Sequence, residues 1–142
     1  MKIAVIDGQG GGIGSEIITR IRKDIGEDLE IIALGTNAVA TANMMKAGAN
    51  KGASGDNAIR VNCPKVDIIC GSAAIVVADS MMGEMTPSSA AVIASSDAPK
   101  LLLPLSVPGI EMVGIPREPL PHLIEALVGR IKVLLKEGNN NV

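Results

Sequence analysis

The sequence predicts a single α/β domain, a three-layer sandwich in which helices cover both faces of a mainly parallel sheet. Short apolar runs alternate with helical patterns from end to end, as repeated β-α-β units require. A chain of 142 residues suits one domain with a substantial core. Because the chain has no Phe, Tyr or Trp, aliphatic side chains must fill that core in layers.

The first half of the chain predicts the order β-α-β-α. Two apolar runs, Lys2–Ile6 and Glu30–Leu34, have the composition of strands that are buried on both faces of a parallel sheet. We expect the first of them at the centre of the sheet. An amphipathic helix over 13–26 follows the first run, and an Ala- and Met-rich helix that ends near Ala47 follows the second.

The second half continues this alternation with weaker signals. We expect a polar, glycine-rich loop over 48–57 and leave 73–78 unassigned. The other expected elements are strands at 59–61 and 66–70, a helix from Thr86-Pro87 to about 95, strands at 100–105 and 110–115, and a final helix beyond Pro121. The predicted domain therefore spans 1–138, and a frayed tail follows at 139–142.

Composition excludes several classes of function. The net charge is −2, basic residues form no run, and no aromatic ring is present to stack on bases, so we expect no nucleic-acid partner. Cys63 and Cys70 fit neither a disulfide framework nor a metal motif, so we expect no metal. The chain also lacks a membrane-length apolar run and a signal-peptide core, which predicts a cytoplasmic protein without a membrane partner.

The segment between the first strand and the first helix predicts a phosphate site. Five of the seven residues from Gly8 to Gly14 are glycine. A phosphate at this place would meet unpaired backbone N–H groups and the positive end of the helix dipole. The alternative is a tight turn that serves only the packing of helix on strand.

The expected ligand contacts come from this loop and from the ends of neighbouring strands. They are Gly8, Gln9, Gly10, Gly11, Gly12, Ile13 and Gly14 from the loop, with Thr36, Asn37, Gly71 and Ser72 from the strand ends.

The spacing of Gly8, Gly12 and Gly14 resembles the cofactor loop of the short-chain dehydrogenases. That resemblance covers the loop alone and implies NAD or NADP as cofactor. The family's chemistry uses a Tyr-x-x-x-Lys pair, and this chain has no tyrosine, so its catalytic apparatus is not carried over.

The end of the second strand leaves the identity of the nucleotide open. An NAD site usually places an acidic residue there, whereas this chain has Gly35-Thr36-Asn37. NAD, NADP and a mononucleotide therefore all stay open as ligands. Alternatively, Thr36 or Asn37 merely caps the following helix.

Three longer runs resemble a small bacterial family of uncharacterised proteins with a Rossmann-like fold. They are Lys2–Gly14, Ala33–Ala38 and Ala78–Glu84. The resemblance implies a Rossmann-like sandwich and no particular activity.

Candidates for catalysis are Asp79, Ser80 and Glu84, which follow a predicted strand in an otherwise apolar stretch. Paired carboxylates can hold a cation or divide acid and base roles. The alternative is that Ser80 and Thr86 cap helices and that Glu84 is solvated.

For the remaining candidates we prefer structural interpretations to functional ones. Cys70 would be a packed thiol rather than a nucleophile, Ser54–Asn57 a turn rather than a wall of the site, and His122 a surface residue. The apolar segment Ile75–Ala78 and the pair Met81-Met82 would need cover from outside, which predicts a homodimer.

These observations lead to three hypotheses about function. The first is a nucleotide-binding domain with NAD(P) as the leading ligand; if the protein is an enzyme, an NAD(P)-linked oxidoreductase comes first. The second is a small regulatory or partner-binding module that senses a phosphorylated metabolite. The third is an interaction protein whose site is empty.

Overall fold

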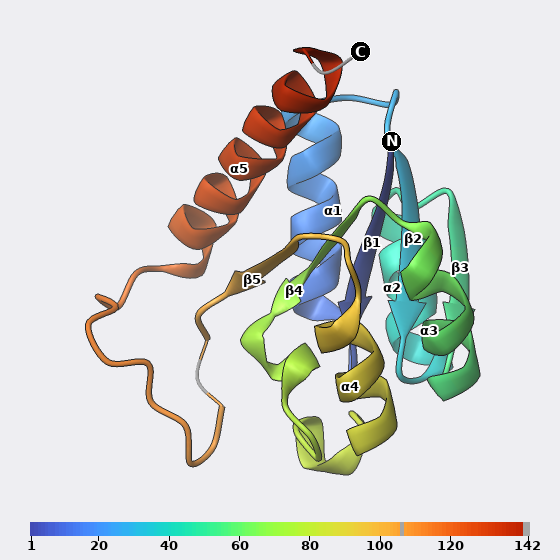
Figure 1. The fold of residues 1–142 in the computed structure, drawn as a ribbon, viewed down its shortest axis with the longest axis vertical. Coiled ribbons are helices and arrows are strands. Elements are labelled where there is room, and N and C mark those ends of the chain that lie inside the picture. The colour runs from blue at the N-terminus through green and yellow to red at the C-terminus, as the bar shows by residue number, and fades with distance from the viewer. Residues whose placement is uncertain (106, 141–142) are drawn as a thin grey trace.

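A computed structural model describes residues 1–105 and 107–140 of the chain. Within them, five parallel strands form one sheet in the order β3-β2-β1-β4-β5 (Figure 1). The strands are β1 (Lys2–Asp7), β2 (Glu30–Gly35), β3 (Lys51–Ser54), β4 (Ile68–Ser72) and β5 (Lys100–Leu103). The helices are α1 (Gly12–Asp24), α2 (Ala38–Ala47), α3 (Asp56–Asn62), α4 (Pro87–Ser95) and α5 (Leu120–Asn140). Short 3-10 helices are η1 (Cys63–Lys65), η2 (Ala73–Val76) and η3 (Met81–Gly83).

Helices cover both faces of the sheet. α1, α2 and α5 pack on one face, and α3 and α4 pack on the other (Figure 1). β1 serves both layers because successive side chains of a strand point to opposite faces. Ile3 and Val5 join the first core cluster, and Ala4 and Ile6 join the second. The predicted Rossmann-like sandwich with the first strand at its centre is therefore confirmed.

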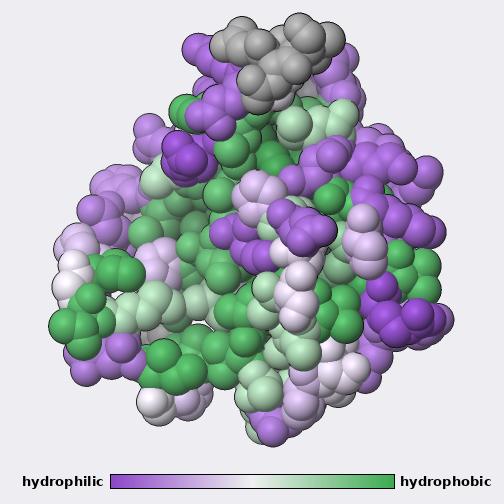
Figure 2. All heavy atoms as spheres, viewed as in Figure 1, coloured by the Kyte–Doolittle hydropathy of each residue, from purple (hydrophilic) through white to green (hydrophobic). Residues whose placement is uncertain are grey.

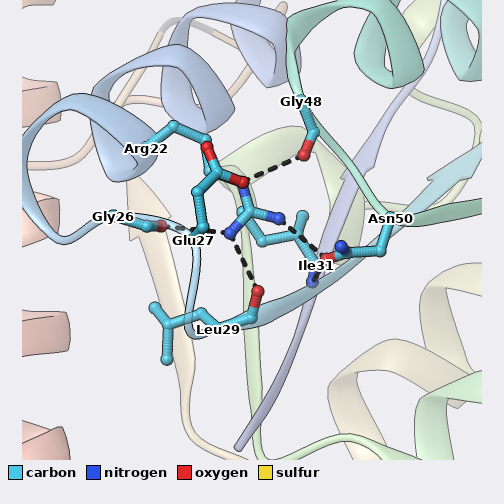
Figure 3. Close-up of polar contacts among 7 residues, drawn as sticks. All are labelled: Arg22, Gly26, Glu27, Leu29, Ile31, Gly48 and Asn50. Carbon is cyan, nitrogen blue, oxygen red and sulfur yellow. Dashed lines mark hydrogen bonds and ion pairs between the residues drawn. The ribbon is translucent and has the colours of Figure 1, made fainter.

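Arg22 ties the elements together at the carboxyl end of α1. Its guanidinium donates to the carbonyls of Gly26, Leu29 and Gly48 and to Oδ1 of Asn50, at 2.7 to 3.1 Å (Figure 3). The side chain is only 9% exposed. A single cation thus satisfies carbonyls at the ends of α1 and α2, where helix dipoles favour positive charge.

Two predictions for the region after α2 are wrong. A strand, β3, lies inside the expected loop, and the helix α3 replaces the strand expected at 59–61. β3 pairs with β2 although its side chains are mostly exposed, so it lacks the apolar signal of a strand. In α3 only Ile59 is buried, and a single buried residue carries no helical periodicity.

The expected edge strand at 110–115 does not form within the described residues, where Ile110 makes only an isolated bridge to Val107. Pro108 and Pro116, together with left-handed glycines at 109 and 114, explain why the segment cannot extend the sheet.

Several other expectations are met or refined. Thr86 caps α4 by accepting the N–H of Ser89 at 3.0 Å, as the Thr-Pro pair predicts. The unassigned segment 73–78 begins with η2, whose Ile75 is fully buried. α5 extends through Asn140 and so includes 139–140 of the expected tail, and 141–142 lie outside the described residues. No helix in the described part of the chain is long and apolar enough to cross a membrane.

Candidate functional site

A cavity of about 290 Å³ lies where β1 and β4 end. The chain leaves β1 toward β2 on one side and β4 continues the sheet on the other, so this is the point at which the strand order reverses. Open parallel sheets bind ligands at such a point. The polar residues that line the cavity are Asp7, Gln9, Ser72 and Ser80, and its apolar wall includes Ile13, Met81, Leu105 and Val107.

Asp7 is the buried carboxyl group of this cavity, with 7% of its surface exposed. Its Oδ1 accepts the N–H of Gly8 at 2.7 Å, and its Oδ2 accepts the N–H of Gly14 in the first turn of α1 at 2.8 Å. Asp7 therefore acts as a helix cap supplied by the preceding strand, in a helix whose own N-cap residue, Gly11, has no side chain. Burial outweighs these hydrogen bonds, and a nearby carboxylate, Glu84, adds repulsion, so the pKa of Asp7 is raised.

The five glycines of the loop divide into two groups. A Cβ at Gly8, Gly11 or Gly14 would lie within 2.8 Å of a neighbouring atom, so these three glycines are required by packing. Gly11 also has a φ of +73°. By contrast, a Cβ at Gly10 or Gly12 would meet nothing within 4 Å, and both residues are exposed. Packing within the chain explains why the first three positions are glycine. It does not explain why Gly10 and Gly12 are glycine.

Glu84 holds the glycine loop in place from the far side of the site. Its Oε1 accepts the N–H of Gln9 at 2.8 Å, the hydroxyl of Thr36 at 2.8 Å and the amide of Asn37 at 2.7 Å. These bonds, the one from Gln9 foremost, lower the pKa of Glu84. Glu84 is thus a clamp between three segments, a role that neither solvation nor catalysis describes.

Thr36 and Asn37 are not among the residues that line the cavity. Asn37 caps α2, because its Oδ1 accepts the N–H of Ala40 at 2.8 Å. Its amide also donates to the carbonyl of Gln9 at 3.0 Å. The capping interpretation therefore holds for Asn37, and the polar atoms of both side chains are already bonded within the chain.

The backbone is strained around the cavity. In the described part of the chain, the non-glycine residues with positive φ are Gln9, Asp79, Met81 and Met82, at 49° to 64°. Such conformations cost free energy for residues with a side chain and gather at functional sites. Met82 is also 96% exposed. The segment Asp79–Glu84 therefore adopts a conformation that costs free energy where it lies against the glycine loop.

The three catalytic candidates do not form one constellation. Asp79 is exposed and is not among the residues that line the cavity, and Glu84 is occupied by the clamp. The Ser80 hydroxyl lines the cavity but donates to the carbonyl of Ala74 at 2.6 Å. Ser72 also lines it, and its Oγ accepts the N–H of Ala74 at 3.3 Å.

Other predicted residues are structural. Cys70 is fully buried, and burial raises the pKa of its thiol to about 12, so the packed interpretation holds. A Cβ at Gly71 would lie 2.8 Å from the carbonyl oxygen of Ile6, which makes that glycine a packing residue. In the segment Ser54–Asn57, Asp56 accepts the hydroxyls of Thr86 and Ser89 and so joins α3 to α4.

His122 has a largely exposed side chain, 3.7 Å from Glu118, as expected of a surface residue.

A second hollow adjoins the first. It measures about 670 Å³, lies between the segment after β5 and the start of α5, and shares Leu105, Val107 and Pro108 with the first cavity. Figure 2 shows apolar surface gathered along this side of the molecule. Val113 is 89% exposed there, and Ile110 and Ile115 are about half-exposed.

The comparison with protein families agrees with the resemblance seen in the sequence. The family model described as Domain of unknown function (DUF3842) matches residues 2–136. The chain belongs to this family. Comparison with curated proteins and with solved structures finds no match to the chain. Membership therefore places the chain in an uncharacterised family, as the sequence indicated, and names no activity.

Sequence reasoning missed Asp7 as a site residue. It lies between the predicted strand Lys2–Ile6 and the expected contacts that begin at Gly8, yet it is an acid directly after a buried apolar run and seven residues before Gly14. A carboxylate at the carboxyl end of a strand can reach the N–H groups of the next helix when the loop is this short. That position was the available signal.

Proposed function

We propose that the cavity at the ends of β1 and β4 binds a small phosphorylated ligand of mononucleotide size. The phosphate would lie at Gly10–Gly12, and the rest of the ligand would enter the cavity. The observation that carries this proposal is the pair of exposed glycines that packing does not explain. Gln9 and Ile13, which flank them, line the cavity, so the two features are continuous.

The hydrogen bonds of the loop support this placement of the phosphate. The N–H groups of Gly8, Gln9 and Gly14 are taken by carboxylates, and that of Gly11 by a carbonyl. The N–H groups of Gly10 and Gly12 have no partner among the described residues. Two free donors beside the amino end of a helix suit a phosphate, and the absence of Cβ atoms allows close approach.

NAD and NADP are second candidates under this proposal. A volume of about 290 Å³ is at the lower end of the usual range for ligand pockets, and a dinucleotide also needs space at the end of β2. Met81 and Glu84 lie close over Gly8 and Thr36 at that end. A dinucleotide would therefore require the segment Asp79–Glu84 to move.

Binding without catalysis fits the residues best. The hydroxyl of Ser80 is engaged by a carbonyl, Asp79 is not among the lining residues, and the thiol of Cys70 is fully buried. A regulatory module that senses a phosphorylated metabolite is thus preferred to an oxidoreductase.

A thermal-shift screen followed by calorimetric titration tests the proposal. The screen takes inorganic phosphate, AMP, ATP, GTP, NAD and NADP, since a ligand at a hundredfold its Kd stabilises by about 2.7 kcal/mol. The best ligand is then titrated into the wild type, Gly12→Val and Gly129→Val. Both glycines are exposed, helical and without neighbours within 4 Å, but Gly129 is in α5. We expect Gly12→Val to lose binding and Gly129→Val to retain it. Equal affinity in all three proteins would contradict the proposal.

We also propose a homodimer. Ile75 does not need a partner, because it is fully buried within the chain. The support comes instead from the apolar side chains exposed at Val113, Ile110 and Ile115. Light scattering at micromolar concentration tests this, and a monomer mass would overturn it.

A further inference from the structure

The charge on the described wall of the cavity is acidic. Among the described residues that line it, Asp7 is the one ionisable side chain, and no Lys, Arg or His contributes to the wall. The other polar wall groups are the neutral side chains of Gln9, Ser72 and Ser80. A ligand group that enters the cavity therefore meets carboxyl oxygens and no compensating cation.

Asp7 retains unused capacity to accept hydrogen bonds. Two carboxylate oxygens have about four acceptor positions in all. Backbone N–H groups donate to it, those of Gly8 and Gly14 at 2.7 and 2.8 Å with that of Ile13 beside them, and no side chain within residues 1–105 and 107–140 does so. The Ser80 hydroxyl donates to the carbonyl of Ala74, and the Oγ of Ser72 accepts the N–H of Ala74. What remains of the acceptor capacity of Asp7 is available to a ligand.

Within the chain, Asp7 has fewer hydrogen-bond donors than its two oxygens can accept. Burial raises the pKa of Asp7 in spite of the backbone bonds, which means that the carboxylate form is less well solvated here than in water. A donor from the ligand would solvate the carboxylate, and a bond to a charged acceptor is among the stronger hydrogen bonds. A second anionic group at this position would instead be repelled.

We infer that Asp7 selects a ligand that carries a hydrogen-bond donor, a ribose hydroxyl or a base amino group, on the part that enters the cavity. This inference rests on the proposed function, because the phosphate at Gly10–Gly12 fixes which end of the ligand enters the cavity. It restricts the ligand class to nucleotides with such a donor. Sugar-free phosphates without a donor group would occupy the glycine loop alone.

The test is a calorimetric comparison of three nucleotides on the wild type. AMP has both kinds of donor, purine riboside 5′-monophosphate lacks the amino group, and 2′,3′-dideoxyadenosine 5′-monophosphate lacks the ribose hydroxyls. We expect AMP to bind and one of the two analogues to bind at least about tenfold more weakly, which identifies the donor that Asp7 accepts. Affinities of all three within twofold of one another would overturn the inference.

The variant Asp7→Asn and inorganic phosphate complete the test. Asn has nearly the same size and can still accept one backbone N–H, but it loses the charge. We expect Asp7→Asn to weaken AMP about tenfold and to bring AMP and the weaker analogue within about threefold. Phosphate alone should bind Asp7→Asn at least as well as the wild type, since a negative charge has been removed. If Asp7→Asn does not fold, the nucleotide series on the wild type decides.

The outcomes separate this inference from the proposed function. If phosphate binds in a way that Gly12→Val abolishes, but AMP binds no better than phosphate, donor recognition by Asp7 is wrong and the phosphate site stands. If neither phosphate nor AMP binds the wild type, both are wrong.

Discussion

At each end of α1 a charged side chain compensates the helix dipole, but the surroundings of the two side chains differ. At the carboxyl end, the Arg22 cation neutralises carbonyl groups, and at the amino end the Asp7 carboxylate neutralises N–H groups. The guanidinium of Arg22 is occupied by three backbone carbonyls and the side chain of Asn50 (Figure 3). Asp7 instead faces a cavity, beside a strained backbone and two N–H groups, of Gly10 and Gly12, that have no partner among the described residues. The comparison indicates that the Arg22 end of the helix serves stability, whereas the Asp7 end combines a helix cap with the strain and the cavity of the candidate site.

The largest expected effect lies at the closed end. Replacing Arg22 by Met removes the guanidinium donor from the carbonyls of Gly26, Leu29 and Gly48, whereas Oδ1 of Asn50 keeps the N–H of Ile31, so we expect a loss of about 3 kcal/mol of unfolding free energy. The matched control is Arg20→Met in the same helix, because among the described residues Arg20 pairs with Asp24 alone, in an ion pair at the surface. Chemical denaturation of both variants measures the difference. Equal losses of unfolding free energy in the two variants would mean that the hydrogen bonds of Arg22 contribute no more than a surface ion pair.

At the open end, Asp7→Asn should cost about 1 kcal/mol near pH 4, because one of two capping acceptors is lost. The pKa of Asp7 is raised in the folded state, so its stabilising contribution is complete below the unfolded pKa and is lost as pH rises through the folded pKa. The destabilisation caused by Asp7→Asn should therefore shrink between pH 4 and pH 7. Denaturant titrations at several pH values measure it, and a destabilisation that grows with pH would contradict this account.

Glu84 should show the opposite dependence on pH with a smaller amplitude. Its pKa is lowered by the bonds from Gln9, Thr36 and Asn37, so its contribution is present above the unfolded pKa and is lost as pH falls through the folded pKa. We expect Glu84→Ala to destabilise less than Asp7→Asn does, since the side chain is partly exposed and water replaces it. Its main effect should be faster amide hydrogen exchange at Gln9 at neutral pH. Unchanged exchange at Gln9 would rule out the clamp.

The smallest expected effect is a gain in stability. Met82 has a φ of 57° and a side chain that is 96% exposed, so Met82→Gly removes backbone strain without removing packing. We expect a stabilisation of roughly 0.5 kcal/mol, because the flexibility of glycine in the unfolded chain offsets part of the relief. Thermal unfolding measures it, and a clear loss of stability would show that the Met82 side chain has a partner.

Much of the fold was predictable because burial on both faces leaves a continuous apolar run. That signal located β1 and β2, and the Thr86-Pro87 pair located the start of α4. β3 was not predictable, because an exposed edge strand is held by its ladder to β2 and has no apolar pattern.

The candidate site was predictable only in part. The glycine loop marked its place, but which glycines serve packing depends on Met44, Ala40 and Met81, which lie far away in sequence. The clamp by Glu84 joins residues 75 positions apart, and no local pattern reports such a bond.

Phosphate binding at Gly10 and Gly12 is tested most directly by a titration of the protein with inorganic phosphate, in which a ¹H–¹⁵N spectrum follows the backbone amide signals. If the open end of α1 is the binding end, the amides of Gly10 and Gly12 shift saturably and before all others, while those of Ile31 and Asn50 beside Arg22 do not move. A titration in which Gly10 and Gly12 stay fixed while other amides shift, or in which nothing saturates, would contradict the account.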